Sequence, residues 1–159
     1  MMTLTDYDIR EQLHESSNSI VYRAVRRDAS RNSPVILKLL RGEYASPEQV
    51  AWFKREYEVT RGLDIASVVD VYALEQDAGL WLMVLEDFGG ESLLRLGVAG
   101  QLNVESFLSL AIQLTDTLGQ LHQRQIIHKD INPANIVLNP ETGEVKLIDF
   151  GISTGLSRQ

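Results

Sequence analysis

The residues best suited to do chemistry lie close together in two short segments of the 159-residue sequence. Residues 128–135 read HKDINPAN, and Asp149-Phe150-Gly151 follows fourteen residues after Asn135, at the end of a predicted strand. Aspartate can accept a proton from a reacting group, and carboxylate and amide oxygens are the ligands that Mg²⁺ prefers. This combination of residue types predicts a site for acid–base or metal-assisted chemistry.

A further carboxylate stands at an unusual position, Glu56, in a helix predicted over residues 47–63. At about 100° per residue, Glu56 falls in the middle of the apolar face of this helix. That face comprises Trp52, Phe53, Val59 and Leu63. A carboxylate is costly to bury unless it meets a cation. Glu56 therefore either pairs with a Lys or Arg from another element or lies at a frayed edge and reaches water.

The elements that position these groups fall into two parts, of which the first is rich in strands. Five strands are predicted, at 7–13, 19–26, 34–40, 68–76 and 80–85. A hairpin turn at Asp77-Ala78-Gly79 joins the last two. The helix that carries Glu56 opens with a capping box of Ser46 and Gln49. Closely spaced strands with short polar loops favour an antiparallel sheet over alternating βαβ units.

The second part follows a break in the pattern at residues 86–90, which read EDFGG and are typical of a hinge between two halves. A long helix is predicted from the N-cap Asn103 to about Arg124, with apolar residues at spacings of three and four. Short strands are predicted at 126–127, 136–138 and 145–148, and the last leads directly into Asp149.

The composition excludes several classes of protein. The formal net charge is −7 and the basic residues form no run, which argues against a nucleic-acid binder. The sequence has no Cys, so disulfides and thiol catalysis are excluded, and a cytoplasmic location is the simplest expectation. The longest apolar run, residues 80–85, is too short for a membrane span, and the first ten residues contain no apolar segment of signal-peptide type.

The pattern H-x-D-x-x-x-x-N at 128–135, with Asp149-Phe150-Gly151 downstream and a strand hairpin between them, resembles the catalytic segment of the eukaryotic-type Ser/Thr protein kinases. This resemblance implies an α+β, protein-kinase-like bilobal fold. The small lobe, at about 7–86, would be a five-stranded antiparallel sheet plus one helix of the family's αC type. A hinge is implied at 87–91, and the first part of a helical large lobe with the catalytic hairpin at 92–159. The kinase domain over 1–159 is therefore expected to be truncated after its DFG motif.

The resemblance also assigns roles in phosphoryl transfer from ATP to the polar residues of the second part. Asp130 is implied as the catalytic residue that orients the attacking hydroxyl group and accepts its proton. Asn135 and Asp149 are implied as the metal ligands, holding Mg²⁺ against the ATP phosphates. His128 is implied to pack beneath Phe150 as a structural residue and not to act as a base.

Lys38 ends the segment VILK, which resembles the kinase strand that carries the phosphate-contacting lysine. It is flanked by apolar residues in a predicted central strand, where an unpaired ammonium group would be expensive. Glu56 follows eighteen residues later on the next helix. The two costly residues therefore explain each other as the Lys–Glu ion pair of a kinase small lobe, and both are predicted to take part in catalysis.

An adenine site is implied around the hinge, because LWLMVLEDFGGESL resembles the last small-lobe strand and the residues after it. Leu85 would be the gatekeeper, and the backbone of Glu86 and Phe88 would hydrogen-bond the adenine. Side chains would cover the base from both sides. The remaining implied ATP-binding residues are Val21, Ile36, Lys38 and Val137.

Several positions depart from the family pattern. The loop at 13–21 reads LHESSNSIV, with His14, Ser16 and Ser19 where the family has glycines. Serine groups can still donate to phosphate, so we expect weaker nucleotide binding but not its loss. The other departures are Ile36 for a small residue, Lys129 for an arginine and Asn132 for the catalytic-loop lysine that neutralises the transferred phosphate.

The motifs predict an ATP- and Mg²⁺-dependent Ser/Thr protein kinase of signal transduction, with an unknown protein substrate. A pseudokinase or nucleotide-binding regulatory module is the first alternative, supported by the departures above. A small-molecule phosphotransferase of the aminoglycoside or choline kinase type is the second, although the DFG glycine and the hinge sequence favour a protein kinase.

The phrases HKDINPANIV and LIDFGIS are also similar to the N-terminal kinase-like domains of bacterial multidomain signalling proteins. In those proteins, ATPase or histidine-kinase modules follow the kinase-like domain, so such modules are possible partners in a longer chain. If the protein ends at Gln159, the helix that begins after Asn103 is expected to expose an apolar face, and activity of this chain alone is doubtful.

Overall fold

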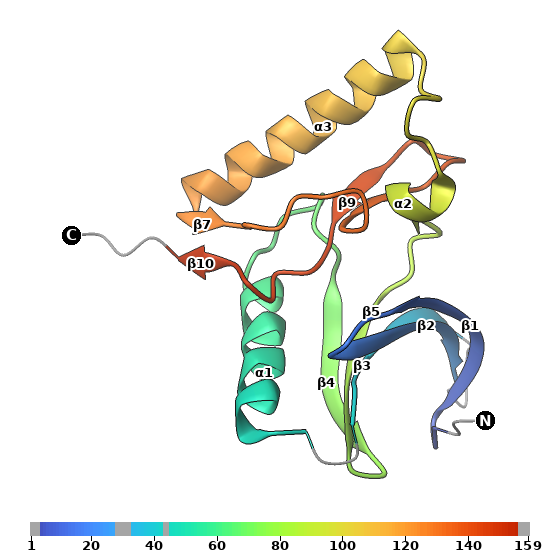
Figure 1. The fold of residues 1–159 in the computed structure, drawn as a ribbon, viewed down its shortest axis with the longest axis vertical. Helices are drawn as coiled ribbons and strands as arrows, with labels where there is room; N and C mark the ends of the chain where they lie inside the picture. Colours follow the sequence, from blue (N-terminus) through green and yellow to red (C-terminus); the bar gives the residue numbers. More distant parts are fainter. Residues whose placement is uncertain (1–3, 28–32, 43–44, 156–159) are drawn as a thin grey trace. The chain divides into compact units, whose positions relative to one another are not determined.

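The computed structural model describes residues 4–27, 33–42 and 45–155. The chain divides into two compact units, whose elements are labelled in Figure 1. Unit 1 comprises Met1–Arg61 and Asp70–Asp87, and unit 2 comprises Gly62–Val69 and Phe88–Gln159. One boundary between the units thus lies between Asp87 and Phe88, inside the segment where the sequence pattern breaks.

Unit 1 is built on a five-stranded antiparallel sheet in the order β1-β2-β3-β5-β4, which confirms the predicted sheet. Its strands are β1 (Tyr7–Glu15), β2 (Ser19–Arg26), β3 (Ser33–Leu40), β4 (Val71–Asp77) and β5 (Leu80–Glu86). The predicted β4–β5 turn is also present, with positive φ angles of 49° at Ala78 and 83° at Gly79. Two left-handed residues in succession suit the twist of a tight hairpin.

Side-chain alternation gives the sheet of unit 1 two different faces. One face holds the apolar core, in which Leu37, Leu82 and Val84 are fully buried. Lys38 lies on the opposite face, because neighbouring residues of a strand point to opposite sides. Val21 is directly opposite Lys38 in the β2–β3 register, so both side chains share this second face. The sheet therefore presents the candidate nucleotide residues away from its own core.

Helix α1 (Pro47–Arg61) carries Glu56 and begins at the predicted capping box. The backbone N–H of Ser46 donates to the Gln49 side chain, and the Gln49 N–H donates to the Ser46 hydroxyl oxygen. Phe53, Glu56 and Thr60 form the buried face of the helix.

Two predictions around α1 were wrong. Trp52 does not belong to the buried face, since it is 55% exposed and its ring lies beneath the Arg55 guanidinium group. The fourth strand begins at Val71 instead of Val68, because Val68 forms a parallel bridge with Leu147 in unit 2.

Unit 2 combines two helices with short strands. The helices are α2 (Leu93–Leu96) and α3 (Val104–Gln123), and the strands are β6 (Glu91–Ser92), β7 (Ile126–Ile127), β8 (Ile136–Leu138), β9 (Val145–Leu147) and β10 (Thr154–Gly155). Strands β6, β8 and β9 form one sheet, and β7 pairs with β10. The predicted N-cap Asn103 accepts from the Ser106 N–H and opens α3.

Helix α3 contacts β7 and β9 with one side, where Leu121 is fully buried. Its other side is apolar and exposed, at Val104, Phe107, Leu108 and Ile112. Among the helices in the described part of the chain, none combines the length and apolarity needed to cross a membrane.

Candidate active site

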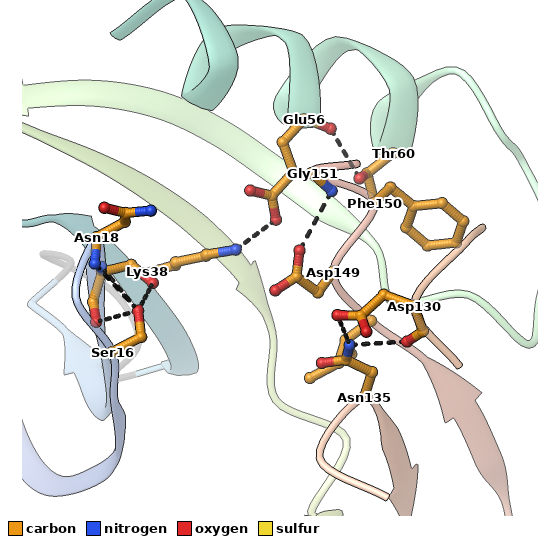
Figure 2. Close-up of polar contacts among 12 residues, drawn as sticks. Ser16, Asn18, Lys38, Glu56, Thr60, Asp130, Asn135, Asp149, Phe150 and Gly151 are labelled. Carbon is orange, nitrogen blue, oxygen red and sulfur yellow. Dashed lines mark hydrogen bonds and ion pairs between the residues drawn. The ribbon is translucent and has the colours of Figure 1, made fainter. Parts of the chain in front are cut away.

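Asp130 lies in the loop between β7 and β8, and its carboxylate is held at both oxygens. The Asn132 side-chain amide donates to Oδ1 over 2.9 Å, and the Asn135 amide donates to Oδ2 over 2.9 Å. The Asn135 amide also donates to the backbone oxygen of Asp130, over 2.9 Å (Figure 2). Two donors on two oxygens fix the direction of the carboxylate, which is what a group that orients a substrate requires.

His128 supports this loop from beneath. Its Nδ1 accepts from the Asp130 N–H over 3.2 Å, so the proton of the neutral ring is on Nε2, which donates to the Ile148 oxygen over 2.9 Å. The imidazole packs edge-on against Phe150, with ring centroids 4.6 Å apart. The expected His128–Phe150 packing is therefore present, and both ring nitrogens are used to hold backbone.

The backbone is strained at two positions around the site. Lys129 has a φ of 71° and Asp149 a φ of 63°, in the left-handed region that side chains other than glycine rarely adopt. Such conformations persist where the surrounding contacts enforce them, often at functional sites. The Gly151 N–H donates to the Asp149 carboxylate over 3.2 Å, which helps to hold that carboxylate in place (Figure 2).

Asn135 and Asp149 come from neighbouring backbone segments, because the Ile148 N–H donates to the Asn135 oxygen over 3.1 Å. Their donor chemistry fits Mg²⁺, which takes hard oxygen ligands and keeps several waters or substrate phosphates in its shell. In residues 4–27, 33–42 and 45–155 there is no cluster of three His, Cys, Asp or Glu that could form an all-protein metal cage. A two-residue magnesium site is compatible with that finding.

In unit 1, Lys38 and Glu56 form the predicted ion pair. Lys38 Nζ donates to Glu56 Oε1 over 2.6 Å, and the two side chains are only 13% and 10% exposed (Figure 2). The contact ties strand β3 to helix α1. It also resolves the open question about Glu56, which meets a cation and does not lie at a frayed edge.

The other residues of unit 1 implied in adenine binding lie along the same region of the sheet. Ile36 pairs with Leu85 across β3 and β5, and it shares the face of Lys38 two residues away. Glu86 ends β5, and its N–H donates to the Asp70 oxygen over 3.0 Å. The Glu86 N–H is thus already occupied within unit 1.

In unit 2, Phe88 and Val137 pack around Gly90. A Cβ atom built on Gly90 would lie 2.6 Å from both Phe88 Cζ and Val137 Cγ1. Real Cβ atoms do not approach other atoms so closely, so only glycine fits here without a shift. The Phe88 and Val137 side chains are therefore brought together around Gly90.

Replacing Gly90 with Ala is expected to lower the free energy of unfolding by about 1–3 kcal/mol, because the added methyl group overpacks this contact. Urea unfolding of the variant measures the change. Gly119→Ala is the matched control, since a Cβ on Gly119 meets nothing within 4 Å in helix α3. That control should stabilise the protein by about 0.5–1 kcal/mol. Equal effects of the two substitutions would contradict the packing at Gly90.

The loop between β1 and β2, where the family has glycines, is closed by its own serines. The Ser16 hydroxyl oxygen accepts from the Asn18 N–H over 3.3 Å (Figure 2). It also accepts from the Ser19 N–H, over 3.1 Å. The Ser16 N–H donates to the Ser19 oxygen over 2.9 Å. Arg41 donates to the Ser16 oxygen from the end of β3. Three backbone N–H groups of this loop therefore bond within the loop.

Sequence reasoning missed two polar contacts beside the break at 86–90. In unit 1, Arg23 Nε donates to Asp87 Oδ2 over 2.9 Å. In unit 2, the Asn139 amide donates to the Phe88 oxygen over 2.7 Å. The sequence places Asn139 only directly after the strand predicted at 136–138, and nothing in it indicated a partner 51 residues away.

Comparison with known proteins agrees with this geometry. A model of the protein kinase domain family matches residues 7–159. Serine/threonine-protein kinase PrkC of Bacillus subtilis is 31% identical over 153 residues, covering 95% of this chain and 23% of the relative. A probable serine/threonine-protein kinase of Clostridium acetobutylicum is 29% identical over 149 residues, covering 92% and 22%.

A relative from an animal matches to a similar degree. Serine/threonine-protein kinase 36 of Pongo abelii is 30% identical over 155 residues, covering 95% of this chain and 11% of that protein. The chain thus spans less than a quarter of the length of each of these curated relatives. The family model covers almost every residue of the chain. The chain therefore belongs to the protein kinase domain family.

Proposed function

We propose that this chain carries the ATP-binding and catalytic residues of a Ser/Thr protein kinase, which transfers the γ-phosphoryl group of ATP to a protein hydroxyl. The observation that carries the proposal is the Asp130 carboxylate, held at both oxygens by amide donors in a strained loop. Phosphoryl transfer needs positioning and charge stabilisation more than covalent chemistry, and a rigidly oriented carboxylate supplies positioning. The relatives named as serine/threonine kinases support the choice of acceptor.

Each residue then has a defined task. Asp130 orients the acceptor hydroxyl and takes its proton. Lys38 contacts the ATP phosphates, and Glu56 holds the Lys38 ammonium group in place through the 2.6 Å contact. Asn135 and Asp149 hold Mg²⁺, which when bound neutralises phosphate charge.

The adenine of ATP is assigned to a second group of residues. The backbone of Glu86 and Phe88 hydrogen-bonds the base, with the Glu86 contribution limited to groups other than its N–H, which Asp70 engages. Apolar side chains are assigned to the ring. These are Val21, Ile36 and Val137. We place the reaction in the cytoplasm, where ATP is supplied, and expect signalling modules elsewhere in a longer protein to use it.

A nucleotide-binding regulatory module is the second candidate, and the closed serine loop favours it. Phosphate cradling uses free backbone N–H groups, and those of Ser16, Asn18 and Ser19 bond within the loop. The Asn132 side chain also lacks the charge of the family's lysine at that position. Such a module would bind ATP and transfer nothing.

Thermal unfolding with and without Mg²⁺ and ATP tests the proposed nucleotide binding. Ligand at about 100 times its Kd stabilises a protein by about 2.7 kcal/mol, so the melting temperature should rise clearly. A transfer assay then offers three acceptors: proteins, aminoglycosides and choline. Label on protein supports the proposal, label on a small molecule supports a small-molecule phosphotransferase, and binding without transfer supports the regulatory module. No thermal shift at saturating ATP would overturn nucleotide binding itself.

Opening the serine loop should tighten ATP binding. The double substitution Ser16→Gly and Ser19→Gly removes the hydroxyl that occupies two N–H groups and restores flexible residues. One additional hydrogen bond to phosphate, worth about 1 kcal/mol, lowers the Kd of Mg-ATP about fivefold. Isothermal titration measures the change, with Ser17→Gly as the control because that side chain takes no part in the closure. An unchanged or higher Kd in the double variant would show that the closed loop is the binding form.

A further inference from the structure

Asn139 is the first residue of the β8–β9 turn, and its side chain makes several hydrogen bonds there. It is only 8% exposed, and both ends of its side-chain amide are used. Its Oδ1 accepts from the N–H groups of Glu141 and Thr142, over 2.9 and 3.2 Å. Its Nδ2 donates to the Phe88 oxygen over 2.7 Å. One side chain therefore folds the local turn and also holds a backbone group 51 residues earlier.

The backbone around Phe88 allows the Asn139 Nδ2 group to approach closely. Gly89 has a φ of 77°, and a Cβ there would lie 3.2 Å from Asn139 Nδ2, so glycine permits the close approach. The Phe88 ring is held separately, by Gly90 beneath it and by the Lys146 ammonium group 5.2 Å from its centroid. The Phe88 carbonyl and ring are thus fixed by two independent sets of contacts.

We propose that Asn139 is a positioning residue for recognition of the nucleotide base. The contacts to the Phe88 carbonyl and to its ring together orient the Cα atom of Phe88 and so place its amide nitrogen, because the bond angles at Cα are nearly fixed; only the φ torsion then remains for the direction of the N–H. The direction of the Phe88 N–H, which is assigned to the adenine, then depends on the hydrogen bond from Asn139. The inference rests on the proposed function, since it concerns how the same site binds ATP.

The two functions of the Asn139 amide can be separated chemically. Asp at this position keeps an oxygen that accepts from Glu141 and Thr142, so the turn persists. It cannot donate to the Phe88 oxygen and places a carboxylate against that carbonyl group instead. Asn139→Asp therefore removes the proposed positioning contact and keeps the turn. Ser also accepts from turn N–H groups but is too short to reach Phe88, so Asn139→Ser is the second variant.

The experiment measures the Kd of Mg-ATP and of Mg-tripolyphosphate for the full chain and its variants by isothermal titration. Tripolyphosphate has no base and does not use Phe88. Asn139→Asp and Asn139→Ser should each raise the Kd of Mg-ATP about fivefold, the value of one hydrogen bond of about 1 kcal/mol to the base, and leave the Kd of Mg-tripolyphosphate unchanged. In turnover assays, the KM for ATP should rise by the same factor while kcat stays constant.

Gln113→Ala is the matched control. Gln113 ties the same turn to helix α3, donating to the Gly143 oxygen and accepting from the Val145 N–H, without contacting Phe88. Because Gln113 and Phe88 share no hydrogen bond among the described residues, the change should alter the Kd of Mg-ATP by less than about twofold.

The outcomes distinguish this inference from the proposed function. If the unchanged protein binds neither ligand, the proposed function falls, and with it the inference. If the unchanged protein binds ATP and both Asn139 variants bind it equally well, only the role of Asn139 is overturned. Equal weakening of ATP and tripolyphosphate would also overturn it, because that result indicates general loosening of the unit. If Asn139→Asp does not fold, Asn139→Ser decides between these results.

Discussion

Replacing Asp130 with Asn is expected to lower kcat for phosphoryl transfer by about 10²–10⁴-fold, the usual contribution of a positioned general base. The Kd of Mg-ATP should stay within about twofold, because the residues assigned to the nucleotide are unchanged. Asparagine cannot accept the proton of the acceptor hydroxyl group. In addition, its NH₂ group would stand where one carboxylate oxygen now accepts a hydrogen bond, from either the Asn132 or the Asn135 amide. One donor loses its partner, which should lower the free energy of unfolding by about 1–3 kcal/mol. Transfer rates, titration with ATP and urea unfolding measure the three quantities.

Asn132→Ala is the control for this prediction, since it removes one donor to the carboxylate and keeps the carboxylate itself. Its effect on kcat should be much smaller, about tenfold, the value of one lost positioning hydrogen bond. If Asp130→Asn retained more activity than Asn132→Ala, Asp130 would not be the proton acceptor.

Replacing Lys38 with Met should abolish the thermal shift with Mg-ATP and lower the free energy of unfolding by on the order of 3 kcal/mol. The reason is that Glu56 would stay in a largely buried position, 10% exposed, without the cation that it meets at 2.6 Å. Removing one partner of a buried pair leaves an uncompensated charge, which is more costly than losing both. Differential scanning calorimetry and urea unfolding give both values.

The double variant Lys38→Met with Glu56→Leu separates stability from function. Without either charge, the contact between β3 and α1 becomes apolar, so most of the lost stability should return. ATP binding should not return, because the lysine assigned to the phosphates is still absent. A double variant that binds ATP like the unchanged protein would exclude Lys38 as the phosphate contact. A Lys38→Met variant of unchanged stability would contradict the buried ion pair.

Much of the fold was predictable because local rules and the global structure agree. The capping box at Ser46 and Gln49 and the cap at Asn103 are local features, and each appears at the predicted position. The Lys38–Glu56 contact could be predicted although it is not local, since two buried charges of opposite sign require partners. The free-energy cost of burying each charge without a partner identified this pair more than the helical or strand periodicity did.

Other features could not be predicted, and the reasons are physical. Helical periodicity gives the angle of Trp52 but not the width of the surface that the sheet covers, and Trp52 falls outside it. Val68 reads as part of a strand, but its partner, Leu147, belongs to unit 2. The closure of the serine loop and the Asn139–Phe88 contact depend on three-dimensional positions of short polar side chains, which bond to whatever lies nearby.

The most direct test of the proposed kinase activity is phosphoamino-acid analysis after the full chain has been incubated with γ-labelled ATP, Mg²⁺ and protein acceptors. The expected result is label in phosphoserine or phosphothreonine with the unchanged protein and none with Asp130→Asn. The contradictory result is a protein that binds Mg-ATP tightly and leaves every protein acceptor unlabelled.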